Sequence, residues 1–239
     1  MLNPFDAGII SFLNGLAHRS GIFDALIRFV SENHLFKGAV PGGLFWWGWF
    51  RKDQLTPKNR ELLLSGLFAG LLALVVARGL AETLPFRERP LQNPAVHFQL
   101  PYEGVQTTLI GWSSFPSDHA AVFFALATTF CFISRTAGIL ALCHAFFIVC
   151  LPRIYLGYHY PTDILVGAIV GIGAACLSQR LALRTAAPRR SLEWIDRQPS
   201  ISYALLFLVT FQIAISFDSV RQFAHFVFAV WRAGSAAPH

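Results

Sequence analysis

Three ionisable side chains lie close together in the segment 153–163, whose sequence is RIYLGYHYPTD. If a helix begins at Pro161, a residue type that suits the first helical position, His159 and Asp163 lie about one helical turn apart. The carboxylate can then hold one ring nitrogen of the imidazole and leave the other nitrogen free to attack. Arg153, just upstream, offers a planar fork of donors that suits phosphate oxygens. The segment therefore predicts a nucleophilic histidine beside an anion-binding arginine.

A second polar segment, 114–119 with the sequence SFPSDH, stands directly before an apolar run. Serine, proline and aspartate are common at helix starts. A helix N-terminus binds phosphate through its unpaired N–H groups and its positive dipole, and here Ser117 would add a hydroxyl and Asp118 a backbone N–H. His119 would lie opposite His159, first as the acid that protonates the leaving oxygen and then as the base that activates water.

A third piece, Arg89-Pro90, follows an earlier apolar run. Arg89 and Arg153 together would neutralise a phosphate and the charge on its equatorial oxygens in the transition state. The combined set predicts phosphoryl transfer that needs no metal and no cofactor. The alternative is that these charged residues only mark the boundary between membrane and water, although ionisable groups at membrane depth are rare and usually functional.

The composition predicts a membrane protein and argues against several other classes. Of 239 residues, 54% are hydrophobic and only 13% are charged, which is too apolar for an ordinary soluble domain. The net charge of +6 is scattered among apolar runs, so a nucleic-acid partner is not indicated. The four cysteines lie in apolar segments without C-x-x-C spacing, which predicts neither a disulfide framework nor a zinc site.

The apolar runs predict an all-α, polytopic membrane protein with a bundle of six transmembrane helices. We expect a single domain over 1–239, with interfacial amphipathic helices in 1–34, the six-helix core in 35–217, and an interfacial helix and tail in 218–239. The six spans are predicted at about 35–50, 62–84, 116–134, 138–155, 161–181 and 200–217.

Six spans place the three polar segments on one side of the membrane. The other side receives many of the basic residues, namely Arg51, Lys52, Lys58, Arg60, Arg135, Arg184, Arg189, Arg190 and Arg197. By the positive-inside rule these loops are cytoplasmic, so the predicted site faces outward. Arg19, Arg28 and Lys37 would then lie outside as well.

Arg89-Pro90, Pro116-Ser117-Asp118-His119 and Arg153-x5-His159-x3-Asp163 resemble the signature motifs of the type 2 phosphatidic acid phosphatase superfamily. These are membrane lipid phosphatases related to vanadium haloperoxidases, and the resemblance covers about residues 60–180. It implies a six-helix membrane fold, a phosphohistidine intermediate on His159, acid–base work by His119, and phosphate binding by Arg89, Ser117 and Arg153. It also implies a bacterial inner-membrane protein that acts on lipids such as undecaprenyl pyrophosphate at the periplasmic face.

Two residues depart from the family pattern. The first motif of the family usually has a lysine in a register that Glu82 occupies here, and either Arg87 or Arg78 could supply the missing cation. The usual glycine of the second motif is Asp118, whose carboxylate would repel a phosphate unless it is turned towards an arginine or a histidine.

The leading hypothesis is therefore a phosphatase that removes the terminal phosphate of a lipid phosphate or diphosphate, with undecaprenyl pyrophosphate favoured. Alternatives are a phosphotransferase that uses the same phosphohistidine, a non-catalytic lipid-binding or transport subunit, and a metal-dependent hydrolase. The expected partners are the lipid substrate and the membrane, whereas the oligomeric state stays open.

Overall fold

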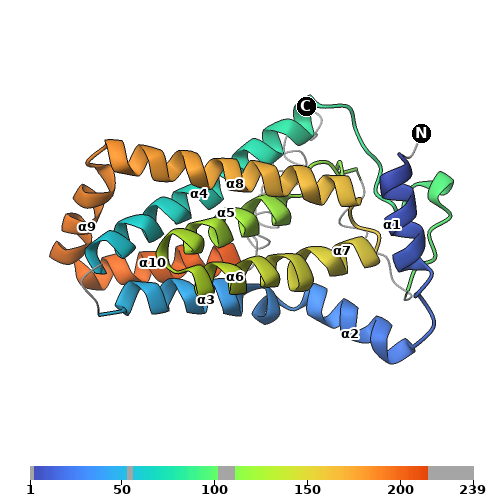
Figure 1. Ribbon diagram of the computed structural model, residues 1–239, viewed down its shortest axis with the longest axis horizontal. Helices are drawn as coiled ribbons and strands as arrows, with labels where there is room; N and C mark the ends of the chain where they lie inside the picture. Colours follow the sequence, from blue (N-terminus) through green and yellow to red (C-terminus); the bar gives the residue numbers. More distant parts are fainter. Residues whose placement is uncertain (1–2, 53–55, 102–110, 215–239) are drawn as a thin grey trace, which may run out of the picture.

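The computed structural model describes residues 3–52, 56–101 and 111–214, and in these ranges the chain forms helices and no strand (Figure 1). The predicted all-α class is thus confirmed for the part of the chain that the structure describes. In chain order the helices are α1 (Pro4–Asn14), α2 (Gly21–Glu32), α3 (His34–Phe50), α4 (Thr56–Thr83), the short turn η1 (Pro94–Val96), α5 (Asp118–Ile133), α6 (Arg135–His144), the π-helical turn η3 (Ala145–Cys150), α7 (Leu151–Tyr155), α8 (Pro161–Arg184), α9 (Ala187–Arg197) and α10 (Pro199–Ala214).

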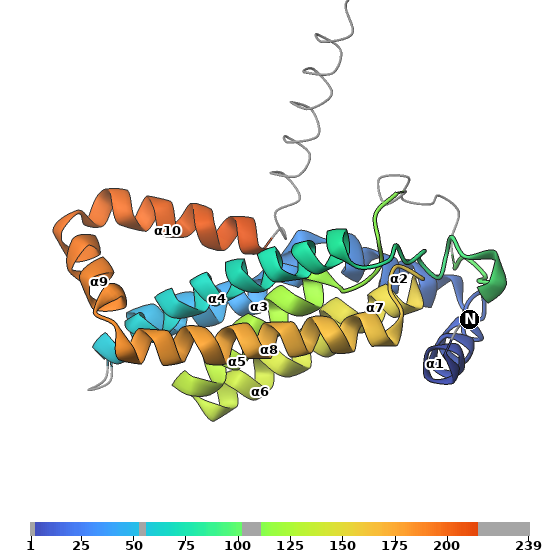
Figure 2. The same ribbon diagram turned by 90° about the horizontal axis from the view of Figure 1, so that it is seen from above.

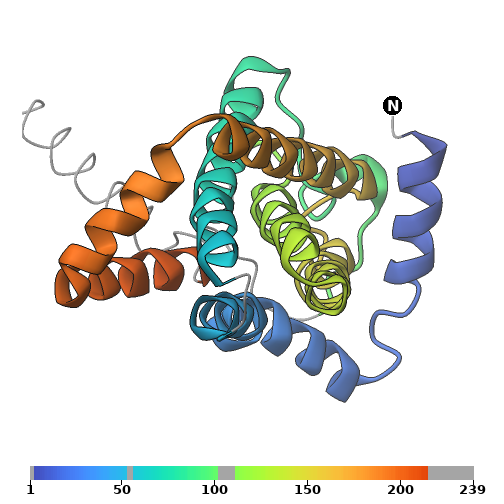
Figure 3. The same ribbon diagram turned by 60° about the vertical axis from the view of Figure 1, so that its left-hand side comes forward.

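Helix α5 lies at the centre of the bundle. In the end-on view it is surrounded by α3, α4, α6 and α8, all of which contact it (Figure 3). Its residues are apolar on every side, and most of them, from His119 to Phe130, are buried. A helix that is apolar all round fits an interior position. The polar start of α5 is therefore buried at one end of the bundle.

Small residues bring α5 and α8 into close contact. A Cβ atom on Gly167 would meet the carbonyl oxygen of Ser117 at 2.5 Å and the Cβ of Ala120 at 2.8 Å. A Cβ atom on Gly171 would collide with the carbonyl oxygen of Ala121. Small residues let membrane helices approach closely. Here they hold together the starts of the two helices that carry the predicted histidines.

The α6–η3–α7 segment changes its hydrogen bonding in the middle. Pro152 has no N–H, and in a regular α-helix its ring would clash with a carbonyl one turn back. The N–H of Leu151 bonds instead to the carbonyl of Phe146, five residues back. This wider turn accommodates the proline, and the helix continues until it presents Arg153 at its end.

Among the described residues, three helices are long and apolar enough to cross a membrane: Pro57–Thr83, Arg135–Tyr155 and Pro161–Arg184. They correspond to the predicted second, fourth and fifth spans. The helices at the third and sixth predicted spans, Asp118–Ile133 and Pro199–Ile213, are apolar but shorter, and α3 has 17 residues where a crossing needs ~20. The chain is a membrane protein, whereas the expectation that it crosses the membrane six times stays a prediction.

Helices α1 and α9 lie at opposite ends of the bundle (Figures 1 and 2). Helices α1 and α2 lie in the range 1–34, where interfacial amphipathic helices were expected, but their position at the membrane interface stays a prediction. The expected basic loop between the last two spans contains helix α9, because Leu192 and Ile195 share one face and are buried. The interfacial helix expected in 218–239 lies outside the described residues.

Candidate functional site

Backbone hydrogen bonds tie the three predicted site segments together at one end of the bundle. The N–H of Ser114 donates to the carbonyl of Arg87 (2.9 Å), and the N–H of Leu91 donates to the carbonyl of Gly157 (3.1 Å). Gly157 has φ +72°, and a Cβ there would meet the ring of Phe98 at 2.8 Å. Only glycine adopts this conformation at little cost, so the close approach of the first and third segments depends on it.

The starts of α5 and α8 meet directly. Ser117 is the N-cap of α5, where its hydroxyl accepts from the N–H of Ala120 (3.4 Å). The N–H of Ser117 donates to the carbonyl of Asp163 (3.1 Å), in the first turn of α8. Both residues are fully buried. The predicted phosphate-binding helix start is thus fixed against the segment that carries His159.

The tautomer of His159 follows from its nearest contact. Its Nδ1 lies 2.8 Å from the backbone carbonyl oxygen of Ser114 and 3.7 Å from Oδ2 of Asp163. A carbonyl oxygen only accepts, so Nδ1 carries the proton and the lone pair of the neutral ring is on Nε2. Asp163 lies beside this proton without being its main acceptor. The arrangement suits a ring that attacks through Nε2.

Burial lowers the pKa of His159, and the positive charges of Arg89 and Arg153 lower it further, while the Asp163 carboxylate acts in the opposite direction. The side chain of His159 is only 6% exposed. The lowered pKa favours the uncharged ring, which is the form that the predicted nucleophile needs.

His119 and Arg153 are in contact. An Nη2 of Arg153 lies 2.7 Å from Nε2 of His119. A guanidinium can only donate, so this nitrogen of His119 accepts and its lone pair points to Arg153. The ring of His119 also stacks on that of Phe123. The second predicted histidine is therefore oriented towards the predicted phosphate-binding arginine.

Arg89 is a buried cation beside another cation. It is 6% exposed, and its Nη1 donates to the carbonyl of Tyr158 at 2.6 Å. Its Nε is buried and has no hydrogen-bond partner among the described residues. Burial, and then the charge of Arg153, lower the pKa of Arg89 to about 10. Two cations whose charges repel each other in this way favour the binding of an anion beside them.

Asp118 is turned towards an arginine, as we expected for a carboxylate beside a predicted phosphate site. Its carboxylate forms an ion pair with Arg78, whose guanidinium also lies over the ring of Trp112 at 4.6 Å from the centroid. The negative charge is thereby compensated, while the backbone N–H of Asp118 stays at the helix start. Of the two cations that could replace the family lysine, Arg78 is therefore the one whose guanidinium contacts the second motif.

The guanidinium of Arg87 contacts Asp163 and a residue of α1 instead. Its Nη1 lies 2.5 Å from Oδ1 of Asp163 and its Nη2 lies 2.6 Å from Oδ2 of Asp6 in α1. No signal in the sequence connected Asp6 or the carbonyl of Ser114 with the site. A backbone carbonyl has no sequence signature, and Asp6 is too distant in the chain for spacing to connect it with the site.

The seven predicted site residues thus form one connected set, and their catalytic roles stay a prediction. His119 contacts Arg153, Ser117 contacts Asp163, and charge interactions connect Arg89 with Arg153, Asp118, Asp163 and His159. Among the described residues, no three histidine, cysteine, aspartate or glutamate side chains are grouped as a metal site would require.

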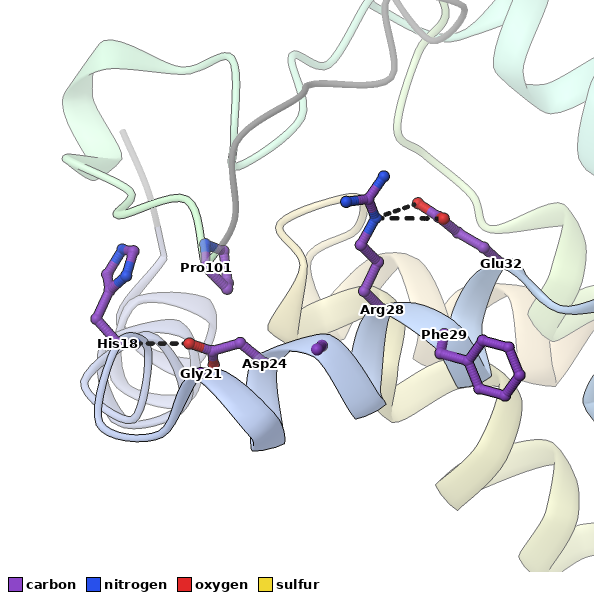
Figure 4. A pocket seen from close by; sticks show the side chains of 8 residues that line it. His18, Gly21, Asp24, Arg28, Phe29, Glu32 and Pro101 are labelled. Atoms are coloured by element: carbon purple, nitrogen blue, oxygen red, sulfur yellow. Dashed lines mark hydrogen bonds and ion pairs between the residues drawn. The ribbon is translucent and has the colours of Figure 1, made fainter.

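A separate pocket of about 460 Å³ lies along α2 and is lined by none of the predicted site residues (Figure 4). Within it Asp24 accepts from the backbone N–H of His18 (3.0 Å), and Arg28 forms an ion pair with Glu32 (3.3 Å). Arg28 and Glu32 pair with each other, and Asp24 accepts hydrogen bonds from a backbone N–H and from the hydroxyl of Tyr155, so the pocket offers no cluster of catalytic groups.

Comparisons with known proteins agree with the motif pattern. Residues 60–187 match the model of the PAP2 superfamily. The chain is 39% identical over 183 residues to the putative undecaprenyl-diphosphatase YbjG of Escherichia coli (strain K12), a match that covers 76% of this chain and 84% of the relative. It is 29% identical over 177 residues to the lipid A 1-diphosphate synthase of the same organism, covering 71% and 72%. LpxE of Aquifex aeolicus shares the fold, with a TM-score of 0.52 and 24% identity over 72% of this chain and 93% of that one.

Proposed function

The chain belongs to the PAP2 superfamily and is a membrane lipid phosphatase, and on this premise we propose that it removes the terminal phosphate of undecaprenyl pyrophosphate or a similar lipid diphosphate. The relative with 39% identity, named a putative undecaprenyl-diphosphatase, supports this choice of substrate. We further propose that the enzyme lies in a bacterial inner membrane with its site facing the periplasm.

The observation that carries the proposal is the combination of a buried cation, Arg89, and a half-buried one, Arg153, with an imidazole whose Nε2 is unprotonated. Arg89 and Arg153 supply positive charge where a terminal phosphate would lie, and Ser117 and the start of α5 add hydrogen-bond donors. His159, with its proton held on Nδ1 by the Ser114 carbonyl, has a lone pair on Nε2. This combination suits attack on phosphorus.

In the first step, Nε2 of His159 attacks the terminal phosphorus and forms a P–N bond. The bond from phosphorus to the bridging oxygen breaks, and His119 donates a proton to that oxygen, which leaves as the lipid monophosphate. In the structure Nε2 of His119 accepts from Arg153. A phosphate that binds Arg153 would draw this guanidinium away, so that Nε2 can take up the proton that it must give.

In the second step, His119 takes a proton from water, and the oxygen attacks the phosphorus while the P–N bond breaks. Inorganic phosphate leaves, and His159 recovers its lone pair on Nε2. The Asp163 carboxylate, 3.7 Å from Nδ1, stabilises the positive charge that the ring carries while it is phosphorylated. Neither step needs a metal ion as Lewis acid, so we expect activity to persist in a chelator.

The proposal is tested by phosphate release from purified lipid phosphates in detergent, with His159→Ala as the blank. We expect release from undecaprenyl pyrophosphate to fall at least about a thousandfold in the blank. His97→Asn is the matched control, because His97 is an exposed loop histidine with φ 49°, a conformation that asparagine tolerates. Equal release by the wild type and the blank from every lipid would refute the proposal.

A second candidate function is phosphoryl transfer to another lipid, which the 29% identity to the lipid A 1-diphosphate synthase favours. The phosphohistidine would be the same, and an acceptor hydroxyl or phosphate would replace water in the second step. Labelled terminal phosphate separates the two reactions. Label that appears on added lipid A in place of inorganic phosphate would identify a transferase.

A further inference from the structure

The carboxylate of Asp6, near the start of α1, is fully buried beside the start of α8. Its Oδ1 accepts from the backbone N–H of Thr162 (2.9 Å), and its Oδ2 accepts from the hydroxyl of Thr162 (2.7 Å). Asn3, the N-cap of α1, donates to the same Oδ2 at 2.8 Å. A buried charge of this kind needs a compensating partner, and Arg87 provides it at 2.6 Å.

Arg87 joins two buried carboxylates. One end of its guanidinium contacts Asp6, and the other contacts Oδ1 of Asp163 (2.5 Å) and the hydroxyl of Thr162 (2.8 Å). The guanidinium also lies over the ring of Tyr160, 3.9 Å from its centroid. The planar fork of arginine suits such a bridge, whereas the point charge of lysine does not.

The second oxygen of Asp163 faces the predicted nucleophile. It accepts from the backbone N–H of Tyr160 (2.8 Å) and lies 3.7 Å from Nδ1 of His159. A continuous series of contacts thus runs from Asp6 through Arg87 and Asp163 to His159. Because Asp6 shares the charge of Arg87, the Asp163 carboxylate keeps part of its negative charge for the histidine ring.

We propose that Asp6 is a positioning residue for phosphoryl transfer, which acts through Arg87 to hold the Asp163 carboxylate beside His159. Helix α1 would then be part of the device that orients the nucleophile, beyond its expected place at the membrane interface. This inference rests on the proposed function, in which His159 attacks phosphorus.

The chain offers a matched control for a purely structural role of α1, because this helix is attached at both ends. At the far end, Asn14 donates to the carbonyl of Gln99 (2.6 Å) and accepts from the N–H of Gln99 (2.9 Å). Removing these bonds weakens the docking of α1 without touching the Asp6 carboxylate. Docking and positioning can therefore be separated by comparing Asp6→Asn with Asn14→Ala.

The experiment measures kcat and KM for undecaprenyl pyrophosphate, or for the best lipid phosphate found in the panel, with the full-length protein in detergent. For Asp6→Asn, which keeps the shape of the side chain but removes its charge, we expect kcat to fall about tenfold with KM within about twofold of the wild type. For Asn14→Ala we expect an unchanged kcat, even if Tm falls. A wild-type kcat in Asp6→Asn, or an equal fall in both variants, would overturn the proposal.

Thr162→Val is the second variant, and it decides the question if Asp6→Asn does not fold. It removes the hydroxyl that contacts both Asp6 and Arg87 but keeps the backbone N–H and the shape of the side chain. We expect kcat to fall about threefold, and an unchanged kcat would overturn the inference.

His159→Ala in the same series separates the inference from the proposed function. An active His159→Ala refutes the proposed function, whereas an inactive one beside a fully active Asp6→Asn refutes only the role of Asp6.

Discussion

At the scale of residues, each imidazole of the site is oriented by a neighbour that can bond in one way only. The Ser114 carbonyl accepts, which keeps the proton of His159 on Nδ1. The Arg153 guanidinium donates, which directs the lone pair of His119 towards it. Both neutral rings therefore carry their proton on Nδ1, but the Nε2 lone pair of His119 is bonded to Arg153, and this contact suits the separate acid–base role that we propose for it.

The pH dependence of kcat/KM follows from the environment of His159. Burial lowers its pKa, Arg89 and Arg153 act in the same direction, and Asp163 opposes them. The attacking ring must be neutral, so the acid limb of the profile should lie below the ordinary histidine pKa of about 6.5. Asp163→Asn removes the charge that raises the pKa, so this limb should move to lower pH while kcat falls.

This prediction is checked by measuring kcat/KM of the wild type and of Asp163→Asn on one lipid substrate from about pH 4 to pH 8. Phosphate esters themselves titrate near pH 6. Since both enzymes use the same substrate, its titration cancels in the comparison. A limb that moves to higher pH in Asp163→Asn would mean that Asp163 does not act on the attacking ring.

At the scale of elements, the contact between α5 and α8 determines how the two histidine segments face each other. A Cβ on Gly167 would lie 2.5 Å from the carbonyl of Ser117, which is backbone and has little room to move. Gly167→Ala should therefore push the start of α8 away from α5. We expect kcat to fall tenfold or more, since a displacement of about 1 Å can cost about a hundredfold, and the free energy of unfolding to fall by about 1–3 kcal/mol.

Gly173→Ala is the control for this prediction, because Gly173 lies on the same helix and a Cβ there meets nothing within 4 Å. It should leave kcat unchanged. Kinetics on the best lipid substrate and thermal unfolding in detergent measure both effects. If Gly167→Ala matches Gly173→Ala in both, the close approach of the two helices does not set the geometry of the site.

The sequence predicted the elements that carry strong local signals. The long apolar run after Pro161 and the polar residues before α5 predicted where those helices begin. It could not predict the π-helical turn before Pro152 or the helical form of α9. The turn depends on how one proline fits among its neighbours, and α9 depends on burying Leu192 and Ile195 against the bundle. Neither cause is local in the sequence.

At the scale of the whole molecule, the same contrast separates the predicted site from its support. Motif residues such as His119 and His159 were found because ionisable groups stand out beside apolar runs. Asp6 lies 156 residues from Thr162 and is joined to it only by the docking of α1 across the end of the bundle. A contact of this range depends on the full fold, so no spacing rule predicts it.

The two ends of the bundle should lie on opposite sides of the membrane. Helix α8 has 24 residues, about 36 Å at about 1.5 Å per residue, and a hydrocarbon core is about 30 Å thick. The site is at the start of α8, whereas α9, with the exposed Arg189 and Arg190, follows its end (Figure 1). By the positive-inside rule, α9 should be cytoplasmic and the site should face outward.

Single cysteines test this orientation after the four native cysteines, Cys131, Cys143, Cys150 and Cys176, are replaced by alanine. Ala95→Cys lies in the exposed turn η1 at the site end, and Ser191→Cys lies on the exposed face of α9. A membrane-impermeant thiol reagent added to intact cells should label Ala95→Cys, and it should label Ser191→Cys only after the membrane is opened. The reverse pattern would place the site in the cytoplasm, and the arginines at the site end would then determine the orientation in place of those on α9. Labelling of both cysteines from outside would mean that α8 does not cross the membrane.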